Sequence, residues 1–427
     1  MADDVKIFGM PAESGRWIFV ALGIIIQVCL GAIYAYGVVR VPLVNYFKTL
    51  GLAPTAMEMT WPFIVFLLFF ALTMPLAGPY IQKMGPGKVC MIGGALCGLA
   101  WFLASFATSP LMLIPLYSII GGIGVGIAYG CPIATSAQWF PDKRGLAVGL
   151  TVLGFGFSAF LISQSNAILM ANYGGIVNSL KIFGVAFFVI TVALSTLLRF
   201  PPAGWKPAGW APPAPKPGAA VKADFMRNEM TKTSSFKGLW LCYTIGALAG
   251  LTAIGILGPV GQDVAKNAGM DVKSATALIT TLTLPFALCN GLGRPIFGTL
   301  TDKLTPKNTA LITYALILVA CLIMYTNYSS INAFIISFAL LWGCLGGWLA
   351  IAPTATASFF GMKDNAKNYG LVFTAYGAGA VIGGIVSAQA KDLMGGYQPF
   401  FLIVAALAVL GMVVAFLMLK PPVKSTA

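Results

Sequence analysis

The sequence predicts an all-α membrane protein with twelve transmembrane helices, arranged as two pseudo-symmetric halves of six helices each. Three observations predict this fold class: the composition, the recurrence of long apolar runs and an internal repeat. Hydrophobic residues make up 58% of the 427 residues and charged residues 9%, whereas about 25% of an average soluble domain is charged. A chain of this composition is expected to reside in a lipid bilayer.

Twelve apolar stretches of about 20 residues follow one another along the chain, and each is long enough to cross a hydrocarbon core of about 30 Å as a helix. The segment before the first stretch, residues 1–16, is mixed in charge and lacks a cleavage pattern of small residues. We therefore expect no signal peptide. The expected spans begin near Trp17, Trp61, Val89, Leu111, Gly145, Leu180, Gly238, Ser274, Thr309, Ile331, Gly370 and Pro399.

A polar, proline-rich segment separates the sixth span from the seventh. This composition is typical of a linker between folded units, and we expect it to be cytoplasmic. The chain is thereby divided into an N-terminal half of residues 1–198, a linker of residues 199–237 and a C-terminal half of residues 238–427.

The two halves resemble each other at nearly constant offsets. MPLAGPYIQKMGPGK (74–88) matches RPIFGTLTDKLTPK (294–307) at an offset of 220, and GLAVGLTVLGFGFSAFLISQ (145–164) matches GLVFTAYGAGAVIGGIVSAQ (370–389) at 225. Such a duplication indicates parallel halves, each built from two inverted triplets of helices. In transporters of this kind the substrate site lies between the halves near the midplane.

The formal net charge is +14, and the positions of the basic residues decide its meaning. With both termini placed in the cytoplasm, most of the 26 lysines and arginines lie on the cytoplasmic side, and Arg294 alone lies within a span. This bias follows the positive-inside rule, so the charge does not indicate a nucleic-acid partner. The six basic residues expected on the outer side are Arg40, Lys48, Lys181, Lys266, Lys273 and Lys391.

The chain contains no histidine, and all eight cysteines fall inside apolar spans, so no set of metal ligands is visible. We interpret the cysteines as small core residues and expect neither a metal nor a cofactor. An intramembrane enzyme would need paired acids, a metal set or a nucleophile with a base, and we therefore expect no enzyme. The cysteines are Cys29, Cys90, Cys97, Cys131, Cys242, Cys289, Cys321 and Cys344.

Arg294 lies inside the eighth span, in the stretch NGLGRPIFGTLTDK. Counting back about eight residues from Asp302 at about 1.5 Å each places it roughly 12 Å into the membrane. A charge at that depth costs at least about 2.5 to 3.5 kcal/mol and usually faces a cavity. The first half has Met74 at the equivalent position, so the fold itself does not require an arginine there.

No acidic residue is placed to neutralise Arg294, because all twelve acids fall in loops, at span ends or in the terminal segment. An uncompensated guanidinium in a cavity predicts an anion site, and its fork of donors suits a carboxylate. The alternative is a side chain that extends toward the cytoplasmic surface. Asn290, one helical turn earlier on the same face, either orients the guanidinium, contacts the anion or bonds to another helix.

The repeated segments also predict a gate. We expect GPYIQKMGPGK and its partner GTLTDK to form cytoplasmic loops that latch the halves together, with Asp302 near a helix end and basic residues beside it. The predicted gating residues are Gly78, Lys83, Gly298 and Asp302.

These two segments resemble the signature of the major facilitator superfamily, and the resemblance covers essentially the whole chain. WFPDKRGLAVG (139–149) looks like the sequence between helices 4 and 5 of the oxalate/formate antiporter and the monocarboxylate transporters. NGLGR is similar to the helix 8 stretch in which both families keep a substrate arginine. The resemblance implies the major facilitator fold, a bacterial inner-membrane transporter of the monocarboxylate family and substrate binding at Arg294.

The same resemblance assigns further site residues. The oxalate transporter has a second cation, a lysine in helix 11, where this chain has Tyr376, and one charge suits one carboxylate. Phe373, Tyr129 and Phe155 occupy places at which that transporter lines its cavity with aromatic side chains. Core packing is the alternative for each of these aromatic residues.

The eukaryotic monocarboxylate transporters keep an aspartate four residues before the arginine and a lysine late in helix 1. This chain has Asn290 and Val38 there, with Arg40 nearby. A proton then travels through a span-end group such as Asp263 or enters with the undissociated acid. We predict a secondary active transporter of small monocarboxylates, L-lactate foremost, that works by proton symport and alternating access as a monomer. The alternative is an oxalate/formate-type organic anion antiporter.

Overall fold

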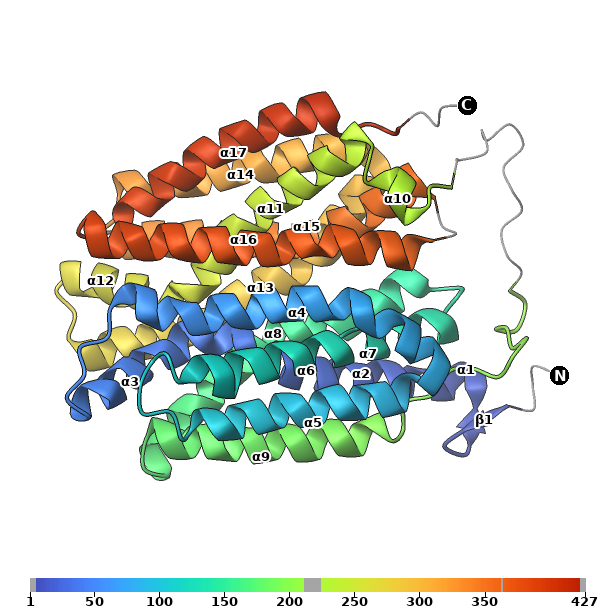
Figure 1. The fold of residues 1–427 in the computed structure, drawn as a ribbon, viewed down its shortest axis with the longest axis horizontal. Coiled ribbons are helices and arrows are strands. Elements are labelled where there is room, and N and C mark those ends of the chain that lie inside the picture. Colours follow the sequence, from blue (N-terminus) through green and yellow to red (C-terminus); the bar gives the residue numbers. More distant parts are fainter. Residues whose placement is uncertain (1–4, 211–223, 362–363, 423–427) are drawn as a thin grey trace.

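Helices make up nearly all of this computed structural model, which describes residues 5–210, 224–361 and 364–422, apart from the side chains of residues 144–145 and 365–366 (Figure 1). A short antiparallel hairpin of β1 (Lys6–Ile7) and β2 (Met10–Pro11) precedes the first helix. The helices before the linker are α1 (Ala12–Gly15), α2 (Trp17–Leu30), η1 (Gly31–Ala35), α3 (Tyr36–Thr49), α4 (Ala56–Met84), α5 (Pro86–Ala104), η2 (Ile114–Ile119), α6 (Ile120–Ala128), α7 (Gly130–Trp139), α8 (Arg144–Asn172) and α9 (Ile176–Ser195). The later helices are α10 (Arg227–Met230), α11 (Ser234–Gly255), α12 (Leu257–Asn267), α13 (Val272–Leu304), α14 (Pro306–Thr326), α15 (Ile331–Phe360), α16 (Asn365–Leu393) and α17 (Gln398–Met418).

The described chain contains 12 helical segments that are long and apolar enough to cross a membrane, which confirms the twelve predicted spans. Some helices begin before the apolar run that predicted them. Helix α4 begins at Ala56 rather than near Trp61, because Thr55 caps it. The Glu58 backbone N–H donates to the Thr55 hydroxyl at 3.1 Å, and the Glu58 carboxylate accepts from the Thr55 backbone N–H at 2.8 Å. This reciprocal pair satisfies backbone donors that the helix leaves free.

The two halves lie side by side with their helices along a common direction (Figure 1). Helix α4 packs along α16, and α8 packs along α13, and these two pairs make most of the contact between the halves. The predicted linker runs from α9 to α11 and includes α10, while its residues 211–223 lie outside the described part of the chain. The predicted fold class, a twelve-helix membrane protein in two halves, is confirmed.

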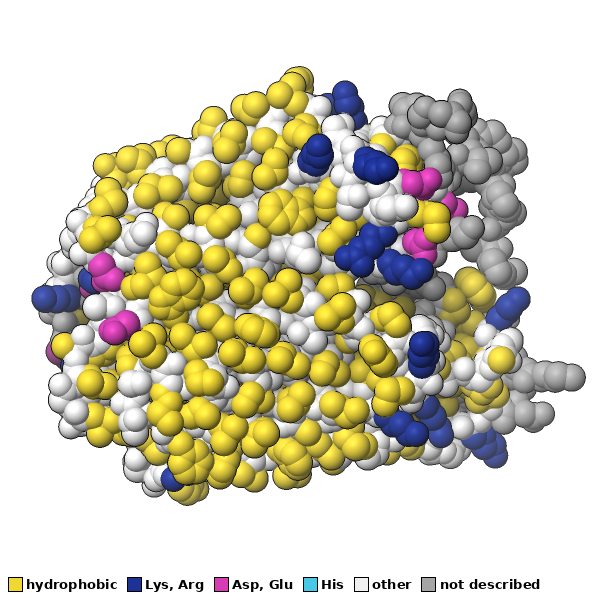
Figure 2. Space-filling model, in the orientation of Figure 1, with side chains coloured by type: hydrophobic (Ala, Val, Ile, Leu, Met, Phe, Trp, Pro, Cys, Tyr) yellow, Lys and Arg dark blue, Asp and Glu magenta, His cyan; other side chains and the backbone are white. Residues whose placement is uncertain are grey.

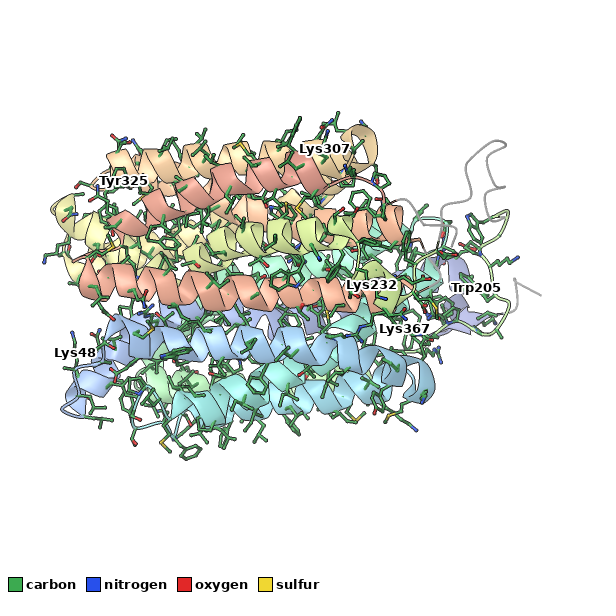
Figure 3. The ribbon with its side chains drawn as sticks, turned by 45° about the horizontal axis from the view of Figure 1, so that its top comes forward. Lys48, Trp205, Lys232, Lys307, Tyr325 and Lys367 are labelled. Atoms are coloured by element: carbon green, nitrogen blue, oxygen red, sulfur yellow. The ribbon has the colours of Figure 1, made fainter. Side chains whose placement is uncertain are left out.

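Both chain ends leave the bundle at the same end, which we call the terminal end (Figure 1). Lys232, Lys307 and Lys367 lie toward that end, and Lys48 and Tyr325 lie toward the opposite end, which we call the far end (Figure 3). Figure 2 shows apolar side chains over the middle of the bundle and lysines and arginines gathered toward the terminal end. An apolar belt between polar ends is the surface that a multi-pass membrane protein presents to lipid.

The repeat extends to the backbone of one turn in each half. Gly85 follows α4 with φ 84° and ψ 155°, and Thr305 follows α13 with φ 85° and ψ 152°. A proline, Pro86 or Pro306, then starts the next helix in both halves. The chain therefore reverses within a single residue, which corrects the prediction of gating loops. Gly78 and Lys83 on α4, and Gly298 and Asp302 on α13, lie in the last turns of helices, because each helix stops only where φ becomes positive.

Arg40, which the sequence places on the outer side, is a buried residue of a long helical segment. It lies on α3, within the first candidate span (Ala12–Thr49), and is only 3% exposed. Its Nη2 donates a 2.7 Å hydrogen bond to the backbone carbonyl of Ala56 at the start of α4.

The halves are held together at the far end. Gly37 on α3 and Gly258 on α12 approach so closely that a methyl group on either one would collide with backbone atoms of the other half. The Asp392 carboxylate of the C-terminal half accepts hydrogen bonds from the backbone N–H groups of Ala56 (3.2 Å) and Met57 (3.1 Å) at the start of α4. Among the described residues, direct hydrogen bonds between the two six-helix halves lie at the middle or toward this end. The far end is therefore closed.

Candidate functional site

Arg294 lies on α13 where that helix meets α8, and it is 5% exposed. Its Nη1 donates to the backbone carbonyl of Val152 at 2.8 Å, and its Nη2 donates to Asn290 Oδ1 over a longer distance of 3.4 Å. Its Nε has no hydrogen-bond partner among the described residues. A guanidinium carries five N–H donors, so this buried cation keeps donors available for a further acceptor.

The charge of Arg294 is not balanced by an acid. The ion pairs of the described residues involve other side chains, and none includes Arg294. The guanidinium points across the contact between the halves toward Val152, not along the helix toward the terminal end. This direction disfavours the alternative of an arginine that extends toward the surface.

Asn290 makes two of the three contacts that the sequence leaves open, one to another helix and one to the guanidinium. Its Nδ2 donates a 3.0 Å hydrogen bond to the backbone carbonyl of Trp342 on α15, and its Oδ1 faces Arg294. The bond to α15 fixes the amide, so Asn290 is positioned to orient the guanidinium. Gly156 on α8 lies directly against Asn290 Oδ1, with no room for a methyl group unless that side chain shifts.

The four predicted aromatic residues are brought together at the contact between the halves. Tyr129, between α6 and α7, lies 5.3 Å from Phe155 on α8 and 6.4 Å from Phe373 on α16, measured between ring centroids. Phe373 stacks on Tyr376 at 5.0 Å. All four side chains are buried. Each ring is therefore packed in the core, which was the alternative to a role in the site. The four rings lie at the interface between the halves, where a substrate site is expected.

Four further aromatic residues belong to this cluster and were missed. Phe70 on α4 lies 5.2 to 6.0 Å from Tyr129, Phe155, Phe373 and Tyr376, and so occupies its centre. The other three are tyrosines. Two of them, Tyr34 and Tyr243, lie in the middle of apolar spans, where a hydroxyl needs a partner, and this was the signal available in the sequence; Tyr369 lies near the start of α16. These tyrosines are Tyr34, Tyr243 and Tyr369.

Several tyrosine hydroxyls belong to the same region as the cation. Those of Tyr34, Tyr129 and Tyr369 lie within electrostatic reach of Arg294. The hydroxyls of Tyr34 and Tyr376 are 2.8 Å apart and form a hydrogen bond between the halves. The site thus combines one cation, several hydroxyls and apolar ring faces. This set can hold a small organic anion by its charged group and its carbon atoms together.

Asp263 and the predicted gating residues are not part of this cluster. The Asp263 carboxylate, on α12 at the far end, accepts hydrogen bonds from Lys391 Nζ at 3.1 Å and from the Tyr328 hydroxyl at 3.4 Å. Burial, and then the negative charge of Asp263, raise the pKa of Tyr328. At the other end of the bundle, Lys83 and Asp302 are exposed and form no ion pair with the described residues.

Comparison with known proteins assigns this chain to a family. The sequence model of the Major Facilitator Superfamily matches residues 21–260 and 239–427. The oxalate:formate antiporter of Oxalobacter formigenes is 26% identical over 398 residues, which cover 92% of this chain and 88% of that protein. Monocarboxylate transporter 13 of Rattus norvegicus is 24% identical over 410 residues, 94% of this chain and 88% of its own. Apicoplast pyruvate carrier 1 of Toxoplasma gondii is 24% identical over 436 residues, 82% of this chain and 79% of its own.

A solved structure shows the same fold. The bacterial homolog to the human lysosomal transporter Spinster, in an inward-facing and occupied conformation, aligns with a TM-score of 0.68 at 16% identity, over 96% of this chain and 98% of that one. At this identity the likeness concerns the fold alone. The two-half bundle, the family match and the transporters among its relatives all indicate a membrane transporter. The chain is therefore an integral, multi-pass membrane transporter, not an enzyme, and it belongs to the Major Facilitator Superfamily.

Proposed function

We propose that this transporter moves small monocarboxylates, L-lactate foremost, together with a proton, by alternating access around Arg294. The observation that carries the proposal is the buried guanidinium, which has no acidic partner among the described residues and an Nε without a hydrogen bond. A carboxylate supplies two acceptor oxygens in the geometry of the guanidinium fork. Substrate binding would thus neutralise a charge that otherwise stays uncompensated in a poorly hydrated interior.

A single cation favours substrates with a single carboxylate. Tyr376 stands where the resemblance to the oxalate transporter implies a second cation, and its hydroxyl bonds to Tyr34. A dicarboxylate held by Arg294 would leave its other carboxylate beside neutral hydroxyls and ring faces. That arrangement costs several kcal/mol in a site of low polarity. The rings of Phe155 and Phe373 would contact the carbon atoms of the acid.

Alternating access follows from the two halves. Residues 1–198 and 238–427 would rock about the site as rigid units. The gathering of basic residues at the terminal end supports placing both termini in the cytoplasm of a bacterial inner membrane. In that orientation the closed far end is the outer gate. We assign the last turns of α4 and α13, with Gly78, Lys83, Gly298 and Asp302, to the cytoplasmic gate.

Two routes are available for the proton. Asp263 is an acid of the far end, and its ion pair with Lys391 would have to break when it takes up a proton. Alternatively, the acid enters in its undissociated form, which requires no acidic residue at the midplane. Asp263→Asn separates these routes: proton-dependent uptake that survives this substitution excludes Asp263 as the carrier. We propose the monomer as the functional unit, because the site is made within one chain.

Anion exchange is the second candidate function. It is favoured by the 26% identity to the oxalate:formate antiporter of Oxalobacter formigenes over most of both chains. Exchange needs no proton carrier, which agrees with the absence of an acid paired with Arg294 among the described residues. Symport and exchange differ in whether uptake depends on a pH gradient across the membrane.

Uptake by proteoliposomes tests both functions. Labelled lactate, pyruvate, formate and oxalate would be supplied with and without an inward proton gradient and with an ionophore that dissipates it. Symport predicts that lactate uptake rises as the external pH falls and collapses with the ionophore. Uptake that ignores the gradient and requires an internal anion would establish exchange instead. A lack of any monocarboxylate uptake, with oxalate transported, would refute the monocarboxylate assignment.

A further inference from the structure

A cavity of about 220 Å³ lies between the two halves near the far end. Its walls come from α3 and α8 of the N-terminal half and from α12 and α13 of the C-terminal half. One water needs roughly 10–15 Å³ of such space, so the cavity can hold a small organic molecule. Apolar residues form much of the wall, and the polar residues that line it are all neutral: Asn45, Ser163, Asn166, Gln262, Thr276 and Thr280.

The cavity is separate from the Arg294 site. Thr280 in its wall precedes Arg294 by 14 residues on α13, which corresponds to about 21 Å of helix. Between the two places α8 and α13 are in contact, with Gly156 against Asn290. Gln164 Nε2 also donates a 3.0 Å hydrogen bond across the halves to the backbone carbonyl of Thr280. A molecule in the cavity therefore cannot touch the guanidinium in this conformation.

Two side chains in the cavity wall have unused hydrogen-bonding atoms. Ser163 is 1% exposed and Asn166 is 3% exposed, and neither Ser163 Oγ nor Asn166 Oδ1 has a partner among the described residues. The two residues are three apart on α8, so they lie on the same face of the helix. A buried polar atom left unpaired costs about 1 to 3 kcal/mol. A ligand that pairs with both atoms would recover this cost.

The cavity offers no charge to an ionised ligand. The described charged side chains on its four helices do not line it. An unpaired carboxylate would therefore lose its hydration without compensation. An undissociated acid fits instead: both polar atoms are covered in this conformation, and once the two side chains turn into the cavity, the acid hydroxyl donates to Asn166 Oδ1 and its carbonyl accepts from the Ser163 hydroxyl. The charged residues in question are Arg40, Lys48, Asp263, Lys266, Lys273, Arg294, Asp302 and Lys303.

We propose that this cavity is a second substrate site, which takes the undissociated form of a short monocarboxylic acid. The proposal rests on the proposed transport function and adds a stage to it. The acid and its proton arrive together at the far end and pass on together toward the site at Arg294. Because the proton stays on the substrate, this route needs no acidic residue at the midplane to carry it.

Protection of an introduced thiol tests the site directly. Ala167 lines the cavity and is exposed, so Ala167→Cys provides a thiol for a maleimide, while the native cysteines are buried apart from Cys289. The probe is lactamide, which resembles lactic acid and stays neutral at neutral pH. We expect lactamide to slow labelling and lactate at the same pH to leave it unchanged. Equal protection by both, or by neither, would overturn the proposal.

The same assay separates this proposal from the proposed function. Lactamide should still protect the thiol in the Ala167→Cys/Arg294→Ala double variant, because the cavity does not include Arg294. Loss of protection there would show that the two places are one site. Lactate transport by the Arg294→Ala variant is measured independently and reports only on the proposed function.

Substitutions in the wall provide the second measurement. Ser163→Ala and Asn166→Leu, each in the Ala167→Cys background, should raise the lactamide concentration for half-protection about fivefold, the loss of one hydrogen bond. Ser337→Ala is the matched control. Ser337 on α15 is another fully buried serine whose hydroxyl lacks a partner among the described residues, and it does not line the cavity. An equal effect of all three substitutions, or no effect of the first two, would refute binding at this wall.

Discussion

Arg294 of the C-terminal half donates a 2.8 Å hydrogen bond from Nη1 to the backbone carbonyl of Val152 in the N-terminal half. The residue assigned to the substrate therefore also links the two halves, through α13 and α8. A carboxylate that approaches the guanidinium competes with this carbonyl for the same donors. We infer that substrate binding and the relative position of the halves are coupled at this bond.

The first prediction is that Arg294→Met abolishes lactate binding while the protein still inserts and folds. Methionine is the residue that the repeat has at the equivalent position, Met74. Removal of a charge-assisted, bidentate contact should cost about 3 kcal/mol or more, which is a loss of at least about a hundredfold in affinity. Binding is measured by calorimetry on purified protein, and folding by its elution as a monodisperse species in detergent.

Arg294→Lys is the companion variant. An ammonium keeps the charge but cannot reproduce the planar fork, so binding should weaken strongly. Undiminished uptake by the methionine variant would end the assignment of Arg294 as the substrate cation.

The second prediction concerns selectivity at Tyr376. Tyr376→Lys adds a cation where the resemblance to the oxalate transporter implies one, so lactate transport should fall and oxalate binding should become measurable. Tyr376→Phe is the control, because it removes the hydrogen bond to Tyr34 without adding charge and should leave oxalate excluded. Competition of unlabelled oxalate with labelled lactate measures the effect. Wild-type protein that binds oxalate as tightly as lactate would show that Tyr376 does not set selectivity.

The third prediction is that Gly37→Ala or Gly258→Ala prevents full closure of the far end. A methyl group at either position would meet backbone atoms of the other half, which cannot rotate away. The halves should separate at this end, with longer distances between spin labels placed on α3 and α12. Gly149→Ala on α8 is the control, since no atom lies within 4 Å of the added carbon. Unchanged distances in both far-end variants would contradict the proposed role of these glycines.

The fourth prediction is a pH-dependent stabilisation by Asp142 at the terminal end. The buried Arg16 donates to both carboxylate oxygens, from Nη1 at 2.6 Å and from Nη2 at 2.9 Å. Burial raises the pKa of Asp142, but the hydrogen bonds and charge of Arg16 outweigh it, so the pKa lies below its ordinary value. The stabilisation is then present above the unfolded pKa of about 3.9 and is lost as the pH falls through the folded pKa.

Asp142→Asn should therefore lower stability at neutral pH by about 1 to 3 kcal/mol, seen as a lower thermal midpoint in detergent. The difference from wild type should shrink in acid. Asp364→Asn is the control, because Asp364 pairs with an exposed lysine, Lys367, and such pairs contribute little. A difference for Asp142→Asn that stays constant with pH would exclude the ion pair as its cause.

The fifth prediction concerns Thr305, whose φ of 85° with ψ of 152° lies in a region that is nearly exclusive to glycine. Thr305→Gly should relieve strain and raise stability by about 1 kcal/mol after the entropy cost of glycine. The reciprocal change, Gly85→Thr, should destabilise the equivalent turn of the first half. Thermal midpoints of the two variants would move in opposite directions, and a shared direction would contradict the equivalence of the turns.

The spans and the duplication could be predicted because their causes are local. In lipid each backbone polar group must be satisfied within its own segment. Each membrane-crossing segment is therefore a helix, and it appears in the sequence as an apolar run. Arg294 could be selected as a candidate for the same reason, since a charge in such a run is costly wherever the run packs. The predicted gating loops failed because a pattern of Gly, Lys and Asp does not show where φ turns positive.

The sequence by itself determined that this protein crosses the membrane twelve times in two related halves and carries an arginine deep inside one span. The tertiary structure alone decided which side chains meet. Tyr34 and Tyr376 are 342 residues apart and form a hydrogen bond, Arg40 is buried against the start of α4, and Ser163 and Asn166 face a cavity between the halves. Hydrophobicity is a property of each segment, whereas the pairing of polar atoms depends on how the two halves pack against each other.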